Sequence, residues 1–419
     1  MRCHSCGLKS EVEQAFLKQN NFLGEPRYFC PTCIVKRQTT SFISTIMVFI
    51  IFSLLAFGFG FSSPEGSAIL AGNLFLISII PLILIHELAH AVTAKLTGLP
   101  VFLILIGIGK TVWSGKFLGM EWIINSLPLG GITAIGARPT PNIRAKLFFV
   151  YLAGPASHAI LAGIFYLLAK GQTAPLFYAL TFANLFLLLT NLYPRKARMV
   201  TGMSGTDGWH LIRVPFWSEA ELTKHYIGYY STEALQAYTA NDFDTAIIWV
   251  DQAMALDANS RVARNVLGVI RMARQEYHEA RHIFLHLLEA GDDPELPGFR
   301  FIILNNIAYM DAIINDAEML LEADNFSAEA FKNLPWIPAV VGTRGTVLVE
   351  LGQLDEGIDL LKQSMSLHPD KQGKALNACH LAIGEFKRGN LDQARKYLES
   401  AKALDAKCFL IPIVEADLA

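Results

Sequence analysis

Four long apolar stretches dominate the first half of the chain. They run over about residues 41–62, 68–94, 146–169 and 175–193. Each is long enough to cross the hydrocarbon core of a bilayer, which takes about 20 apolar residues in a helix. Within the first two stretches and the segment that joins them, Glu65 and Glu87 are the only charged residues. The pattern predicts a polytopic membrane domain over residues 38–215, built as a bundle of about four spanning helices.

Basic residues gather on one side of these stretches, and the opposite side carries only Lys170. They precede the first stretch, recur between the second and third, and follow the fourth: Lys36, Arg37, Lys95, Lys110, Lys116, Arg138, Arg144, Lys146, Arg195, Lys196 and Arg198. Connections that face the cytoplasm carry an excess of Lys and Arg. The sequence therefore predicts a multi-pass protein of the cell membrane with its N- and C-termini in the cytoplasm.

Residues 100–140 do not follow a helical pattern. β-Branched and aromatic residues alternate there with seven glycines, namely Gly107, Gly109, Gly115, Gly119, Gly130, Gly131 and Gly136. This composition is typical of short strands and turns. The segment is also strongly apolar, and strand pairing satisfies backbone groups beside lipid. We therefore expect a small membrane-associated β-hairpin.

A repeat begins after about residue 225. Phe243 and Ala246 recur 34 residues later as Tyr277 and Ala280. Three small residues each precede another small residue by twelve positions, in the pairs Gly268 and Ala280, Gly345 and Gly357, and Ala382 and Ala394. A helix–turn–helix unit of this length resembles the tetratricopeptide repeat. We expect four or five units, forming a mainly α, solenoid domain over residues 225–410 that binds a cytoplasmic protein or peptide.

The composition agrees with this division of the chain. Hydrophobic residues make up 52% of the sequence and charged residues only 17%, below the usual quarter. The residues after Ser218 nevertheless have the composition of an ordinary soluble protein. The net charge of −2 gives no electrostatic reason to expect a nucleic-acid partner. The lipid bilayer is the partner that the composition predicts.

Four of the six cysteines form two Cys-x-x-Cys pairs separated by 23 residues. Pairs at this spacing predict a zinc-ribbon-like module over residues 1–37. A structural zinc ion would be held there by Cys3, Cys6, Cys30 and Cys33. Because the surrounding core is small, metal binding would supply much of the folding free energy. Cys379 and Cys408 stand alone and are expected to be buried.

The second apolar stretch contains the motif His86-Glu87-Leu88-Ala89-His90. Histidines four residues apart share one face of a helix and can bind a single zinc ion, while the intervening Glu acts as general base. On a soluble helix the same residues would fit a solvated polar face. Inside a bilayer, ionisable groups without partners are costly and are usually functional. The catalytic interpretation is therefore favoured.

A catalytic zinc ion needs a third protein ligand and one open position. Asp207, in Thr206-Asp207-Gly208 just after the fourth stretch, is the candidate. An Asp-Gly pair is also typical of a turn or a helix start. His210, three residues further on, is a competing ligand. Taken alone, the Asp-Gly pair favours a turn or helix start. Whether Asp207 or His210 completes the zinc site stays open.

These motifs together resemble the site-2 protease family of intramembrane zinc metalloproteases, over roughly residues 68–215. Four segments carry the resemblance: His86–His90, the glycine-rich region from Ile106 to Gly131 with its Pro128-Leu129-Gly130-Gly131, the run Ala153-Gly154-Pro155-Ala156-Ser157-His158, and Asn191-Leu192-Tyr193-Pro194 followed by Asp207-Gly208. Two departures stand out. The family has Asn where this chain has His158, which we expect to be a core histidine hydrogen-bonded to the backbone. Asp207 follows Pro194 by thirteen residues, further than in many members.

The resemblance implies zinc-dependent hydrolysis of peptide bonds within or at the edge of the bilayer. Zinc would polarise the scissile carbonyl and activate a water, and Glu87 would accept and relay its proton. Asn191 would hold the substrate or the oxyanion. The expected substrates are membrane-anchored proteins, such as regulators or leftover signal peptides. The β-hairpin would either offer an edge strand that pairs with an unwound substrate or only pack against the spans.

Two other functions fit part of the sequence. A catalytically silent membrane scaffold would act through the helical repeats, but it predicts decay of the metal site, and His86, Glu87 and His90 are intact. Prenyl-protein endopeptidases also use His-Glu-x-x-His, with a Glu on a later membrane helix as third ligand. The stretches 146–169 and 175–193 contain no Glu or Asp, which disfavours that class.

Overall fold

The computed structural model describes residues 17–20, 26–30, 33, 51, 54, 63–171, 174–199, 202–292, 296, 298–368 and 370–418. The chain divides into two compact units, which are described separately. One is Ile34–Thr232, and the other combines Met1–Cys33 with Glu233–Ala419. The predicted first span (41–62) lies outside the described residues apart from Ile51 and Leu54, and so do Cys3 and Cys6. The predicted domain boundaries stay predictions.

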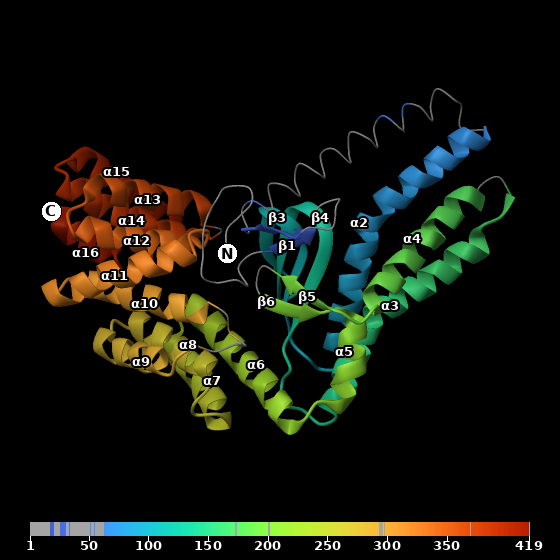
Figure 1. Cartoon of the computed structure of the whole chain (residues 1–419), viewed down its shortest axis with the longest axis horizontal. Coiled ribbons are helices and arrows are strands. Elements are labelled where there is room, and N and C mark those ends of the chain that lie inside the picture. Colours follow the sequence, from blue (N-terminus) through green and yellow to red (C-terminus); the bar gives the residue numbers. More distant parts are fainter. Residues whose placement is uncertain are drawn as a thin grey trace. The chain divides into compact units, whose positions relative to one another are not determined.

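Three helices among the described residues are long and apolar enough to cross a membrane. They are α2 (Pro64–Leu96), α3 (Ile143–Leu168) and α4 (Ala174–Leu192), which run side by side in Figure 1. Large apolar side chains are exposed along all three, among them Ile77, Ile80, Ile160, Leu167, Phe182 and Leu189. Exposed apolar surface on this scale marks contact with lipid rather than water. These helices match three of the four predicted spans.

Small side chains let the three helices approach closely. Ala183 of α4 is fully buried and packs with Leu82 of α2 and Leu187 of α4. At the C-terminal end of α2, Ala91 and Ala94 pack in one cluster with Val150 of α3. Such contacts are typical of membrane bundles, in which close packing rather than hydrophobicity holds the helices together.

The glycine-rich segment forms a single antiparallel hairpin of β3 (Val101–Phe117) and β4 (Met120–Ile135). Leu118 (φ 53°) and Gly119 (φ 74°) form the turn between paired Phe117 and Met120. Positive φ at both central residues is the type I′ geometry that matches the twist of a hairpin. The expected short strands appear as shorter paired segments within these two long elements. The register is irregular: Leu103–Ile106 pairs with Gly131–Ala134 on one side and with Glu121–Ile124 on the other, and Thr111–Phe117 pairs with Met120–Asn125.

After α4 the chain forms a second, small hairpin and a short helix. Strands β5 (Lys196–Met199) and β6 (Gly202–Gly205) pair antiparallel. Helix α5 (Asp207–Arg213) follows, then a short 3₁₀ helix η3 (Val214–Phe216). Arg144 near the start of α3 donates hydrogen bonds to the Trp217 carbonyl and the Glu219 carboxylate. The segment after α4 is therefore anchored to α3.

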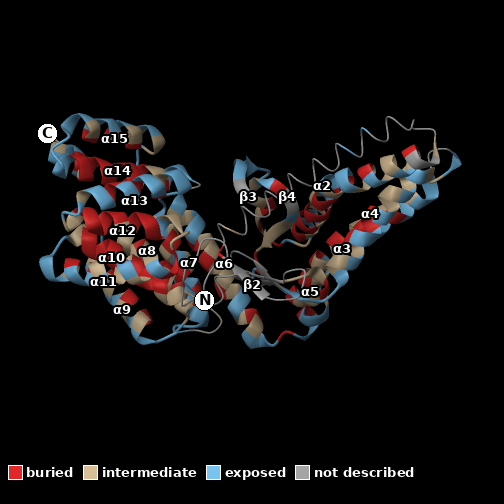
Figure 2. Cartoon of the chain, turned by 45° about the horizontal axis from the view of Figure 1, so that its top comes forward, coloured by how far each residue is buried: buried red, intermediate tan, exposed pale blue. Residues whose placement is uncertain are grey.

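The second unit is a stack of antiparallel helices (Figures 1 and 2). In chain order they are α6 (Glu219–Thr239), α7 (Phe243–Leu256), α8 (Arg261–Ala273), α9 (Tyr277–Glu289), α10 (Phe299–Ile314), α11 (Ala317–Asn333), α12 (Pro338–Glu350), α13 (Leu354–Leu367), α14 (Lys371–Lys387), α15 (Leu391–Leu404) and α16 (Ile411–Leu418); α6 begins in the first unit. Figure 2 shows α10, α12 and α14 largely buried, whereas α11, α13 and α15 expose their outer sides.

The small residues that revealed the repeat lie where these helices touch. A side chain on Gly345 of α12 would come within 2.9 Å of the Gly357 carbonyl of α13. A side chain on Gly268 of α8 would meet the Phe284 ring of α9 at 2.6 Å. The prediction of helix–turn–helix units is thus confirmed. Cys379 and Cys408 are buried as expected, with their sulfur atoms 3.9 Å apart.

At the N-terminus, β1 (Leu17–Asn20) pairs antiparallel with β2 (Pro26–Phe29). Cys30 follows β2 directly and is buried, and Cys33 is half-buried. Since Cys3 and Cys6 lie outside the described residues, the zinc ribbon stays a prediction.

Candidate metal centre

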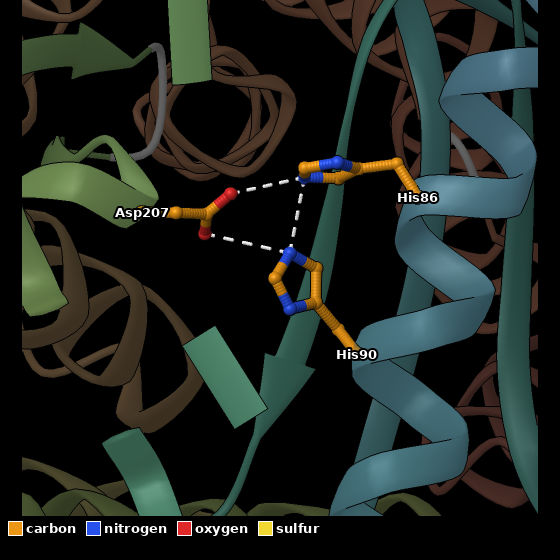
Figure 3. A group of neighbouring side chains, drawn as sticks. All are labelled: His86, His90 and Asp207. Atoms are coloured by element: carbon orange, nitrogen blue, oxygen red, sulfur yellow. Dashed lines mark hydrogen bonds and ion pairs between the residues drawn. The ribbon is translucent and has the colours of Figure 1, made fainter. Parts of the chain in front are cut away.

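Helix α2 places His86 and His90 on one face, one turn apart. Each histidine is 5% exposed, and their Nε2 atoms lie 3.1 Å from each other. Asp207 of α5 faces both rings (Figure 3), with its Oδ2 3.0 Å from His86 Nε2 and its Oδ1 3.4 Å from His90 Nε2. Among the described residues these three form the one group arranged to hold a metal ion.

Between Pro194 and Asp207 the chain forms the paired strands β5 and β6. Their first pair is Lys196 with Gly205. At the open end of the hairpin, next to that pair, the Thr206 backbone N–H donates to the Arg195 carbonyl at 3.0 Å. The Thr206 hydroxyl donates to the Tyr193 carbonyl at 2.8 Å. The hairpin therefore ends beside the point where it began. Asp207 returns to the end of α4 despite its distance in sequence.

Two packing contacts fix α5, and Asp207 with it. A side chain on Gly208 would lie 1.9 Å from the Leu192 carbonyl oxygen, so only glycine lets α5 approach the end of α4 this closely. On the other side, the rings of His210 and Tyr151 of α3 stack at 4.3 Å with an angle of 10° between their planes. His210 thus packs against α3, and the described metal-ligand group does not include it.

The geometry of the three side chains fits zinc. Tetrahedral ligands at bond lengths of 2.0–2.1 Å lie about 3.3 Å from one another. The two Nε2 atoms are 3.1 Å apart, and each lies close to a different oxygen of Asp207, at 3.0 Å for His86 and 3.4 Å for His90. His90 Nδ1 lies 2.6 Å from the Val150 carbonyl, which can only accept, so Nδ1 carries the proton and Nε2 is free to bind the metal. Gly154 of α3 leaves the space beside both rings, because a Cβ there would lie 2.4 Å from His90 Nε2.

The electrostatics of α5 also suit a cation site. Burial would raise the pKa of Asp207, but its interactions with the adjacent His86 and His90 outweigh burial and lower that pKa below its ordinary value. The carboxylate is therefore charged. Burial lowers the pKa of His210, which leaves its ring neutral where it packs on Tyr151.

Glu87 lies between the two histidines in sequence and is held by β4. The Thr133 hydroxyl lies 2.7 Å from Glu87 Oε2 and 3.1 Å from the Glu87 carbonyl oxygen. Gly131 leaves room for the carboxyl group, since a Cβ there would lie 2.6 Å from Glu87 Oε1. The second half of the glycine-rich segment therefore forms one wall around this carboxylate.

Replacing Thr133 with Val should slow peptide hydrolysis about 10–100-fold, because a hydrogen bond to a charged group contributes about 1.5–3 kcal/mol. Zinc content should not change, since Thr133 touches Glu87 and none of the three metal-ligand candidates. Thr133→Ser keeps the hydroxyl and is the matched control. Equal rates for the Val and Ser variants in a cleavage assay would show that the hydroxyl does not position Glu87.

Two other predicted residues stand apart from this cluster. Asn191 donates from Nδ2 to the Leu187 carbonyl at 2.9 Å, and in the described part of the chain its side chain contacts none of His86, His90 and Asp207. Its proposed role on substrate or oxyanion stays a prediction. His158 is buried as expected, but its hydrogen bond goes to the Asn184 side chain rather than to the backbone.

Several residues of the site carried no signal in the sequence. Thr133 contacts Glu87 through its hydroxyl, and Val150 contacts His90 through its backbone carbonyl. Asn184 contacts His158 and is an amide in an apolar helix that belongs to no motif. Each lies at least 26 positions from its partner. Only a three-dimensional structure brings such pairs together.

Comparisons with known proteins agree with this geometry. The profile of peptidase family M50 matches residues 74–290. A protein of Helicobacter pylori (strain J99) described as a "Putative zinc metalloprotease" is 40% identical over 50 residues, which is 12% of this chain and 14% of that protein's length.

Solved structures of two other proteins are also similar. One is a thermophilic TPR protein of Thermus thermophilus, at 18% identity, covering 46% of this chain and 98% of that chain with a TM-score of 0.37. Another is PilW, a type IV pilus biogenesis factor, at 16% identity, 46% and 86% coverage and a TM-score of 0.34. Both TM-scores are low, so the description of the repeats rests on the helix contacts given above and not on these similarities.

Proposed function

Because the chain belongs to peptidase family M50, whose profile covers more than half of it, we propose that it is an intramembrane zinc metalloendopeptidase of the site-2 type. Its substrates would be membrane-anchored proteins. The observation that carries the proposal is the convergence of His86, His90 and Asp207, from a membrane helix and the segment after α4, at separations that suit one zinc ion.

The side chains around the site have separate tasks in hydrolysis. Bound zinc supplies a Lewis acid that polarises the scissile carbonyl and lowers the pKa of a coordinated water to about 7. Glu87 Oε2 is held by Thr133, so Oε1 is the oxygen that accepts a proton from the attacking water and passes it to the leaving amine. Val150 keeps the proton of His90 on Nδ1. The charged Asp207 balances the charge of the metal.

The apolar surface of α2, α3 and α4 supports a site that works within the bilayer. His86 and Glu87 are 5% exposed in a helix whose outer side carries Ile77 and Ile80. Low water content strengthens each charge–dipole contact in the site. We further propose a multi-pass topology with both termini in the cytoplasm, on the strength of the basic residues that flank the spans.

The two terminal modules are assigned supporting roles. Stacked helix pairs such as α10–α15 form extended surfaces for peptides and proteins, and we assign the repeats to binding a cytoplasmic partner or substrate segment. The two Cys-x-x-Cys pairs are assigned a structural zinc ion without an open position.

The test compares the membrane proteomes of cells that carry the wild-type chain or Glu87→Gln. Gln keeps the volume of Glu87 but cannot accept the proton, so the substrate is expected to accumulate uncleaved in the variant. A single-span protein or fragment that accumulates only in cells carrying Glu87→Gln is then the substrate. Re-expression of the wild-type chain should clear the accumulated species.

Identical proteomes across growth conditions would contradict the proposal. The repeats would then be the working part of a catalytically silent scaffold, and deletion of residues 225–410 would change the cells where Glu87→Gln does not. A shared phenotype of the deletion and Glu87→Gln supports the protease instead.

A further inference from the structure

The face of α3 that meets the metal centre carries three residues at intervals of four. Val150 binds His90, Gly154 leaves space for both histidine rings, and His158 comes next. His158 is 1% exposed. Its ring stacks on His86, with ring centroids 5.0 Å apart and planes at 26°. Residues four apart share one helix face, so α3 contacts both zinc-binding histidines from the same side.

Asn184 of α4 determines which nitrogen of His158 carries the proton. The Asn184 Nδ2 donates to the Leu180 carbonyl at 2.9 Å, and that carbonyl can only accept. The Asn184 Oδ1 is therefore the atom that lies 3.0 Å from His158 Nδ1. An oxygen can only accept, so Nδ1 of His158 bears the hydrogen. The other nitrogen, Nε2, is left as an acceptor.

Two buried nitrogen atoms in these stacked rings have no hydrogen-bond partner within the described part of the chain: His158 Nε2 and His86 Nδ1. A neutral histidine that binds metal through Nε2 carries its proton on Nδ1. His86 Nδ1 is then a donor and His158 Nε2 an acceptor. Metal-binding histidines almost always donate this proton to a neighbouring acceptor, as His90 does to Val150.

We propose that His158 is the positioning residue of His86: a bridging water accepts the hydrogen bond of His86 Nδ1–H and donates one to His158 Nε2, while Asn184 holds the His158 tautomer. A buried water is stable where it has polar partners. The pair Val150 and His158 would then orient both zinc-binding histidines from α3. This inference rests on the proposed function of the same site.

The test measures zinc affinity, and it separates the acceptor nitrogen of His158 from the stacking of its ring on His86. His158→Phe keeps an aromatic ring against His86 but removes the acceptor, and we expect zinc affinity to fall about 10–100-fold, as for other lost partners of metal-binding histidines. His158→Gln restores an acceptor and should recover most of the affinity. Asn184→Leu should weaken zinc binding in the same direction, because the Nδ1 proton of His158 loses its partner.

The measurement uses the full-length chain in detergent, by competition of a chelator for zinc and by the absorption spectrum of the cobalt(II) form. Of the two expected zinc ions, the measurement concerns the membrane-site ion, which the double variant His86→Ala with His90→Ala should lack. Zinc bound as tightly by His158→Phe and by Asn184→Leu as by the wild type would overturn the inference and leave the proposed function standing. A wild-type chain with no ion that depends on His86 and His90 would instead overturn the proposed function. If His158→Phe does not fold, Asn184→Leu and His158→Gln decide.

Discussion

The chain carrying both His86→Ala and His90→Ala should contain one zinc ion fewer than the wild type and hydrolyse no substrate. Wild type is expected to hold two ions, one between His86, His90 and Asp207 and one on the N-terminal cysteines. Removing two of three ligands leaves Asp207 alone, and a single carboxylate does not retain zinc in a site built for three protein ligands. Metal analysis of the purified protein in detergent measures the change.

The cysteine pairs provide the matched control. Cys3→Ser with Cys6→Ser should remove the other ion and leave the membrane ion in place. The two double substitutions together should leave no zinc. A zinc content unchanged by the loss of His86 and His90 would refute the assignment of the catalytic metal, whatever the outcome for the cysteines.

Asp207→Ala should weaken zinc binding at the membrane site by more than 100-fold, beyond the loss of about 10–100-fold typical of a group that only supports a ligand. Asp207 is the one acidic side chain in the group and lies 3.0 Å from His86 Nε2. Its removal leaves two neutral histidines to hold a divalent ion. Peptide hydrolysis should be lost with the metal, and excess zinc should restore part of it.

His210→Phe separates the two candidates for the third ligand. Phe preserves the stack on Tyr151, which holds α5 against α3, and removes the ring nitrogens. We expect zinc affinity and hydrolysis close to those of the wild type. The opposite pattern, with zinc lost from His210→Phe and kept by Asp207→Ala, would make His210 the ligand and require α5 to rotate.

The sequence predicted those parts of the site that depend on local spacing. His86 and His90 meet because residues four apart share a helix face, and their placement inside an apolar helix marked them as functional. The helix pairs of the second unit followed from the positions of small residues such as Gly345 and Gly357. In both cases the interacting residues are close in sequence or recur at a fixed interval.

The parts that could not be predicted depend on contacts between distant segments. The glycine-rich composition predicted strands and turns but not which segments pair: Leu103–Ile106 pairs with both Glu121–Ile124 and Gly131–Ala134. Thr133 and Val150 contribute single polar atoms whose partners lie 46 and 60 residues away. Asp207 was a candidate ligand that the resemblance supported. The spacing alone did not show how the chain between Pro194 and Asp207 returns to the two histidines.

The β5–β6 hairpin separates chain length from ligand position. Hydrogen bonds at its base, from Thr206 to Arg195 and Tyr193, bring Asp207 back beside α4 whatever the number of residues beyond them. The interval between Pro194 and Asp207 therefore carries no information about the metal geometry. A sequence search that fixes this interval would miss proteins with the same zinc site, whereas one that fixes the Asp-Gly pair and allows a hairpin of any length before it would find them. Gly208 is the residue that such a search should keep, because only glycine fits against the Leu192 carbonyl.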